Sequence, residues 1–92
     1  MTGKTSRKRY VAGPALTLGE AKSLRRGMML YHRENHNADD TCEQWKVNGA
    51  VKTWKRDASR VQVPVKHGMY DHGYVTESDL LLVSLSEEEV IE

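Results

Sequence analysis

Alternating apolar and polar residues dominate the middle of the chain, from position 44 to position 66. Two runs rich in Val, Trp and Thr are joined by Asn48-Gly49, a pair that suits the positive φ values of a type I′ turn. A third run begins after only the three residues 57–59. The pattern therefore predicts a β-hairpin at Asn48-Gly49 that continues into a three-stranded antiparallel meander.

The expected register assigns the hairpin side chains to two faces of a sheet. One face carries Trp45, Val47, Lys52 and Trp54, and the other carries Lys46, Val51, Thr53 and Lys55. In the third run the inward residues are Val61, Val63 and Val65, and the outward residues are Arg60, Gln62, Pro64 and Lys66. Because neither hairpin face is cleanly apolar, the strands fit a strongly curved small barrel. Pro64 cannot donate to a ladder, which places it at a sheet edge or a bulge.

Local signals predict shorter elements on both sides of the meander. Thr17 and Glu20 have the spacing of a capping box, so a helix of about two turns follows Thr17. Residues 28–33 are a strand candidate, followed by a polar loop over 34–41. Residues 67–73 are rich in turn formers, residues 76–79 favour a helical or 3₁₀ turn, and residues 80–83 are the last expected strand.

Length and charge limit the organisation of the chain. With 92 residues and a net charge of +1, the chain supports one domain, predicted over residues 15–85. Residues 1–14 open with basic side chains and are expected to form a disordered arm, and residues 86–92 are expected to form a frayed acidic tail. The single cysteine excludes an internal disulfide framework and fits a reducing cytosol. No apolar run is long enough for a signal peptide or a membrane span.

The order of these elements resembles that of the SH3-like barrel, over roughly residues 24–84. Three places carry the resemblance: residues 24–31, similar to the family's Gly-Asp lead into its first strand; Trp45 at the start of the second strand; and residues 73–80, similar to the turn before the last strand. Met28 stands where the family has an acid, and Thr76 and Leu80 depart from the Gly-x-apolar-Pro-x-x-Tyr-Val pattern of that turn. The resemblance implies a small five-stranded barrel, and the missing Pro…Tyr pair counts against binding of proline-rich peptides.

A second resemblance concerns the string from Val51 to Arg56 and its continuation through Val63 to Gly68. This string looks like small uncharacterised proteins encoded by bacteriophages. It implies no biochemical activity.

A basic and aromatic cluster on the meander is the best candidate binding site. Its members are Lys46, Lys52, Trp54, Lys55, Arg56, Arg60 and Lys66. Cations would follow a nucleic-acid backbone, and an exposed Trp54 could stack on a base. The alternative is that both tryptophans are core residues and that the charges protect an edge strand.

Other groupings of reactive or exposed residues give weaker candidates. Met69, Tyr70 and Tyr74 form a protein-interface candidate, with simple anchoring of the loop as the alternative. The four histidines, with Cys42, Asp39 and Asp40, lack the closely spaced ligand pairs of structural zinc sites. No nucleophile, base and oxyanion donor converge, so neither catalysis nor a metal or other cofactor is expected.

The sequence therefore predicts an all-β, five-stranded SH3-like barrel with a short N-terminal helix. The predicted function is non-enzymatic binding of nucleic acid through the basic face. The alternative is a protein-interaction module, for example a phage protein that docks on a host protein and modulates it. A monomer or weak dimer in the cytoplasm is expected, the host cytoplasm if the protein is viral, with no membrane partner.

Overall fold

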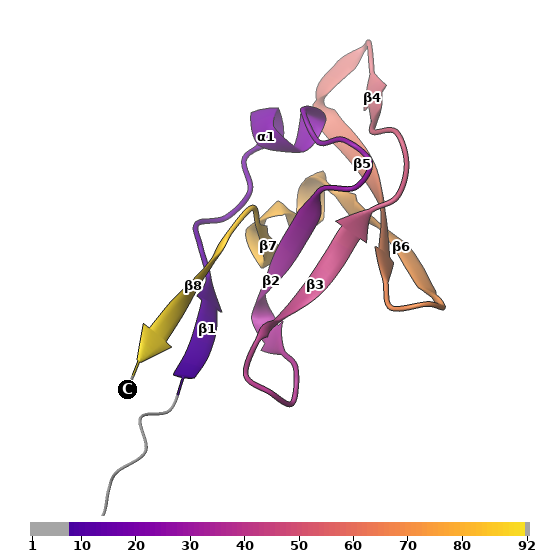
Figure 1. The fold of residues 1–92 in the computed structure, drawn as a ribbon. Coiled ribbons are helices and arrows are strands. Elements are labelled where there is room, and N and C mark those ends of the chain that lie inside the picture. The colour runs from indigo at the N-terminus through magenta and orange to yellow at the C-terminus, as the bar shows by residue number, and fades with distance from the viewer. Residues whose placement is uncertain (1–7, 92) are drawn as a thin grey trace, which may run out of the picture.

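The computed structural model describes residues 8–91. In chain order its elements are β1 (Lys8–Ala12), α1 (Leu18–Lys22), β2 (Met29–His36), β3 (Cys42–Val47), β4 (Lys52–Trp54), β5 (Asp57–His67), β6 (Asp71–Thr76), the 3₁₀ helix η1 (Glu77–Leu82), β7 (Val83–Ser84) and β8 (Glu87–Ile91). Strands predominate, as the sequence predicts, and Figure 1 shows their arrangement. Neither helix in the described part of the chain has the length and apolar character needed to cross a membrane.

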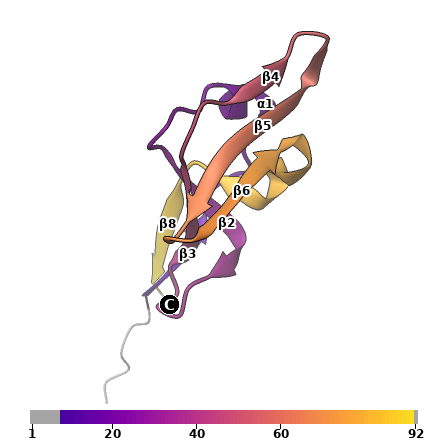
Figure 2. The ribbon, with the colours of Figure 1, turned by 90° about the vertical axis from the view of Figure 1, so that its right-hand side faces the viewer.

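Within residues 8–91, six strands form one antiparallel sheet in the order β4-β5-β3-β2-β7, with β6 also paired to β5. The long β5 therefore has β6 on one edge, while β4 and β3 share its other edge in succession (Figure 2). The two end strands, β6 and β7, do not pair with each other in this part of the chain. The sheet is therefore open, and a closed five-stranded barrel is not present.

The core lies on the inner face of this sheet. Val61, Val63 and Val65 of β5 are 1%, 0% and 2% exposed, which confirms the predicted inward alternation. Leu30 and Val47 from the neighbouring strands are fully buried beside them. Trp45 packs on this cluster while remaining partly buried, in agreement with its predicted core position.

The predicted hairpin at Asn48-Gly49 is wrong. β3 does not pair with β4, neither turn residue has a positive φ, and the backbone N–H of Asn48 donates to the carbonyl of Pro64 at 3.0 Å. The hairpin lies instead between β4 and β5, where Trp54 pairs with Asp57. In the predicted register Lys52 would share the core face with Val47, and burying an unpaired ammonium is costly. The actual register places Lys52 opposite Gln62 on the outer face.

Pro64 sits in the gap between β3 and β4. Its carbonyl points to Asn48, so its nitrogen points to the same edge of β5, where β3 has ended and β4 has not begun. The missing N–H therefore breaks no ladder hydrogen bond. The expected irregularity at Pro64 is present as a break in pairing along this edge.

The predicted capping box at Thr17 is confirmed. The Thr17 hydroxyl accepts from the backbone N–H of Glu20 at 3.1 Å, and the Glu20 carboxylate accepts from that of Thr17 at 2.9 Å. At the start of η1 the Asp79 carboxylate accepts from the backbone N–H of Thr76 at 3.0 Å and from its hydroxyl at 3.1 Å, which agrees with the helical or 3₁₀ turn expected over residues 76–79. Because η1 runs on to Leu82, the expected last strand over residues 80–83 is reduced to β7.

The structure corrects the predicted basic arm and acidic tail in their described parts. β1 and β8 pair antiparallel, with Tyr10 opposite Glu89, as a two-stranded ribbon beside the main sheet (Figure 1). Two backbone hydrogen bonds fix it: Tyr10 N–H to Asp40 at 3.1 Å and Gly13 N–H to Ser86 at 2.8 Å. Residues 1–7 and 92 of the predicted arm and tail lie outside the described residues.

The predicted loop over residues 67–73 is mostly strand. His67 pairs with Asp71, so only residues 68–70 turn the chain between β5 and β6. Gly68 has a φ of 68°, the left-handed conformation that glycine adopts most readily. The turn formers therefore mark the tip of a second hairpin.

Candidate nucleic-acid interface

The register places the predicted basic residues on one face of the sheet. Lys46 of β3, Lys66 of β5 and His72 of β6 form one row across the strands. The next row lies two residues before Lys66 on β5, where Pro64 is opposite Tyr74 of β6. The row after that contains Lys52 of β4, Gln62 of β5 and Thr76 of β6. All of these side chains point away from the valine core, and none of these positions is acidic. We call this set, together with Arg60, which lies two residues before Gln62 on β5, the outer face.

At one end of the outer face, Lys46 and Lys66 lie directly opposite each other. Like charges in directly opposed positions destabilise a sheet. Within residues 8–91 neither ammonium has an acidic partner that would offset this repulsion. Both lysines border a depression of about 300 Å³, together with Met29, Gln44 and Gly68. An anion placed between the two ammonium groups would offset this repulsion.

At the other end, Trp54 is half-buried between two cations. The Arg60 guanidinium carbon lies 4.0 Å from the centre of its ring and the Lys52 ammonium lies 5.0 Å from it. Arg60 also approaches the Glu77 carboxylate at 3.9 Å, a long contact between partly exposed groups. The ring is thus outside the core, and it orients the two cations through cation–π contacts.

The hairpin turn adds two further cations, because Lys55 and Arg56 are exposed between β4 and β5. Asp57 follows them, and its carboxylate accepts from the Ser59 hydroxyl at 2.5 Å and from the Ser59 backbone N–H at 3.1 Å. These bonds are the main reason that the pKa of Asp57 is lowered, with Arg60 contributing less. The turn therefore carries one firmly ionised acid among its cations.

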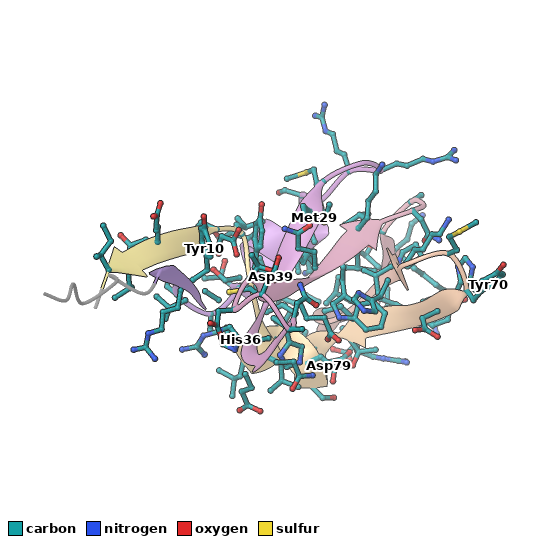
Figure 3. All side chains as sticks on the ribbon, turned by 60° about the horizontal axis from the view of Figure 1, so that its bottom comes forward. Tyr10, Met29, His36, Asp39, Tyr70 and Asp79 are labelled. Carbon is teal, nitrogen blue, oxygen red and sulfur yellow. The ribbon has the colours of Figure 1, made fainter. Side chains whose placement is uncertain are left out.

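The predicted protein-interface residues separate into two places. Met69 and Tyr70 are 75% and 87% exposed at the tip of the β5–β6 hairpin, where Tyr70 points away from the body of the protein (Figure 3). Tyr74 is 61% exposed, and its position opposite Pro64 puts it on the outer face between the two groups of cations.

The histidines make separate contacts. His36 contacts the carbonyl of Tyr10 at 2.8 Å, His67 contacts that of Gln44 at 2.8 Å, and His72 contacts the Asn48 side chain at 3.3 Å. The His32 Nδ1 accepts the backbone N–H of Asn35 at 2.9 Å. Within residues 8–91, no three metal-ligating side chains gather in one place.

Cys42 lies beneath the β1–β8 ribbon and is fully buried. Desolvation, with the nearby Glu87 carboxylate, raises its pKa to about 11, so the thiolate is disfavoured. His36 approaches the thiol only at 4.0 Å. This geometry does not activate a nucleophile.

The structure also reveals a polar cluster around Glu43 that the sequence reasoning missed. The Glu43 carboxylate accepts from the Trp45 indole at 2.9 Å and from the Asn35 amide at 3.4 Å, and it lies 3.5 Å from the His67 ring nitrogen. Partial burial raises the pKa of Glu43, but the two hydrogen bonds and the imidazoles of His67 and His32 outweigh burial and lower it overall. The only sequence signal was the spacing of Glu43 and Trp45, which puts both on one strand face.

No family model matches the chain, and neither a curated protein nor a solved structure matches it. The class of this protein is therefore described from its fold and its candidate site alone. The chain is a mostly β protein with an open antiparallel sheet whose outer face is cationic.

Proposed function

We propose that this protein is a non-enzymatic nucleic-acid-binding module, and that its outer face contacts the phosphate backbone. The carrying observation is the Lys46–Lys66 pair, two directly opposed cations without an acidic partner in the described chain. A phosphate between them would replace their repulsion with two attractive contacts. The depression they border offers room for such a group.

The spacing of the outer-face cations also suits a polyanion. Lys66 and Arg60 are six residues apart on β5, and a strand rises about 3.3 Å per residue, which gives about 20 Å. Each strand of duplex DNA carries one phosphate per 3.4 Å or so of helix axis, so about six phosphates of one strand fall within this distance along the axis. Tyr74 lies between the two ends, exposed enough to stack on a base.

An SH3-like fold remains part of the proposal. The strand order and the position of η1 between β6 and β7 support it, since the resemblance expects a 3₁₀ turn before the last strand. In this proposal β4 and its turn are an addition to that plan, and they carry the cations farthest from the core.

The test is binding of short labelled single-stranded DNA, duplex DNA and RNA, measured by fluorescence anisotropy across about 50 to 200 mM salt. If about four phosphates are neutralised, the slope of log affinity against log salt is roughly −3 to −4. Lys66→Gln is expected to weaken binding and to make the slope shallower by about 0.7–0.9. Arg33→Gln removes the same charge beside η1, away from the outer face, and is the matched control.

Two results would reject the proposal. One is the absence of salt-dependent binding to any of the three nucleic acids. The other is an equal loss with Lys66→Gln and Arg33→Gln, because the effect would then follow net charge and not the outer face.

A second candidate function is protein interaction, as for a phage protein that docks on a host protein. The observation that favours it is the exposure of Met69 and Tyr70 at one hairpin tip. Tyrosine and methionine are enriched at interfaces. A discrete protein recovered by pull-down, and lost with Met69→Ala and Tyr70→Ala together, would support this function over nucleic-acid binding.

A further inference from the structure

A pocket of about 230 Å³ lies in the opening between β6 and the strands β2 and β7. Its apolar lining includes Val65, Val75 and the Trp45 ring. His67 packs on Trp45 with ring centres 5.0 Å apart but is not among the lining residues, so another part of the Trp45 ring faces the pocket. In Figure 3, Asp79 of this pocket and Met29, which borders the depression beside Lys46 and Lys66, lie on opposite sides of the molecule. The pocket therefore lies on the other side of the sheet from the outer-face cations, and Tyr74, at the edge of β6, borders both.

The polar lining of the pocket is acidic. Glu43 and Asp79 both line it, and none of the described lining residues is Lys or Arg. The Trp45 indole and the Asn35 amide donate to one oxygen of Glu43, and the other oxygen lies 3.5 Å from the His67 Nε2 and keeps a lone pair for a further donor. Asp79 uses one oxygen for the η1 cap, which leaves its second oxygen for another donor. An apolar cavity with two carboxylates complements a cation on an apolar stem.

The edge of β6 beside this pocket presents backbone hydrogen-bonding groups. The carbonyl of Pro64 points to Asn48, away from β6, so Pro64 and Tyr74 form a non-hydrogen-bonded pair. The N–H and C=O of Tyr74 therefore point away from β5, to the edge where no strand of residues 8–91 pairs. An extended peptide can add to such an edge.

Gly73 leaves the inner side of this edge open. A Cβ built on Gly73 meets no atom within 4 Å, and Gly73 lines the pocket. A residue of an added strand lying opposite Gly73 shares its face, because directly opposed residues point the same way. Its side chain would therefore enter the pocket.

We propose that the edge of β6 binds an extended segment of a partner protein and that an arginine of this segment fills the pocket. The arginine stem packs on the valines, the planar guanidinium lies against Trp45, and Glu43 and Asp79 accept its hydrogen bonds. Backbone bonds to Tyr74 hold the segment in register. This inference does not rest on the proposed nucleic-acid function, because it uses the other face of the sheet.

The test uses the full chain, labelled with nitrogen-15, and the peptide acetyl-Val-Thr-Arg-Thr-Val-amide. Saturable NMR shifts are expected at the backbone amides of residues 72–75 and at the Trp45 indole. A twin peptide with citrulline in place of arginine has the same shape without the charge, and it should bind about 10-fold more weakly or worse. Equal binding of the two peptides, or no saturable shifts, would overturn the inference.

Two variants locate the binding. Gly73→Val fills the open space with a residue that strands favour, and should abolish peptide binding in a folded protein. Glu43→Gln keeps an oxygen for the Trp45 indole but removes the charge. This variant should bind the arginine peptide more weakly and should bind the citrulline peptide with unchanged affinity. Lys66→Gln on the outer face should leave peptide binding intact while it weakens nucleic-acid binding, so the two proposals can fail separately. Full affinity in Gly73→Val or in Glu43→Gln would refute the site.

Discussion

Replacing Lys66 with glutamate should stabilise this protein, although it changes a surface charge in a well-formed sheet. Lys46 and Lys66 lie directly opposite each other across β3 and β5. Lys66→Glu turns this repulsive pair into an attractive one without a change in the core. The gain depends wholly on the observed register, because the register expected from the sequence places Lys46 opposite Val51.

The size of the gain follows from the geometry of an antiparallel pair. Opposed Cβ atoms lie about 4.5–5.5 Å apart, so the two charges at the ends of their side chains are about 7 Å apart. In water, two unit charges at this distance repel or attract each other by about 0.6 kcal/mol. Replacing the repulsion by an attraction therefore raises the free energy of unfolding by about 1.2 kcal/mol. Screening at about 0.1 M salt removes roughly half of this. We therefore expect a gain of about 0.5–1 kcal/mol.

Urea unfolding is the suitable assay, because urea leaves the ionic strength unchanged. At about 0.1 M salt the midpoint of Lys66→Glu should rise by a few tenths of a molar or more. The gain should vanish in about 1 M salt, where charges are screened within about 3 Å. It should also vanish when Lys46→Gln is present, since the partner charge is then gone. An equal gain in both backgrounds would refute the pairing of β3 with β5 at these positions.

Three further predictions test the core and the Glu43 cluster. Val63→Ala should lower the free energy of unfolding by about 2–3 kcal/mol, from two buried carbons and the cavity they leave, whereas Gln62→Ala on the outer side should change it by less than about 0.5 kcal/mol. The buried Cys42 thiol, with its pKa of about 11, should fail to react with Ellman's reagent at mildly alkaline pH until urea unfolds the chain, and prompt reaction would contradict its burial. Because the pKa of Glu43 is lower in the folded state, its charged form adds stability above the ordinary glutamate pKa of about 4.3. This stability is lost as the pH falls below that value, so Glu43→Gln should flatten the acid side of the stability curve, and an unchanged acid side would argue against the Trp45–Glu43 bond.

The parts of the fold that depend on local chemistry were predictable from the sequence. The period-two valines of β5 gave the inner face, and the Thr17–Glu20 spacing gave the start of α1. Each of these signals lies within a few residues, so no knowledge of distant partners was needed. The 3₁₀ turn after Thr76 was predictable for the same reason.

The parts that depend on distant partners were not predictable. Asn48-Gly49 has strong turn chemistry, but the cost of burying Lys52 and the pairing of β5 with both β3 and β4 override it. The ribbon joins residues 8–12 to residues 87–91, and neither segment has enough apolar side chains to look structured alone. Its ladder of backbone hydrogen bonds forms only when the two segments meet.

The candidate site shows the same division. The sequence placed Arg60 and Lys66 correctly on the outward side of β5, because both follow its alternation with the valines, whereas it placed Lys52 on the opposite face. It could not show that Lys46 meets Lys66, which depends on the pairing of two strands separated by a whole hairpin. The acidic pocket was missed altogether, since its lining comes from β2, β3, β5, β6, η1 and β7.

One strand explains why the two proposed surfaces can coexist in so small a protein. Along β5, Val65 faces the pocket while its neighbours Pro64 and Lys66 face outward. Successive side chains of a strand point to opposite faces, so the same backbone separates an acidic, apolar cavity from a cationic surface by the thickness of a single sheet. An anion on one face and a cation on the other would then attract each other weakly through the sheet. Binding of the arginine peptide should therefore weaken neither the affinity nor the salt slope for nucleic acid, and a marked loss of either would mean that the two ligands compete for one face.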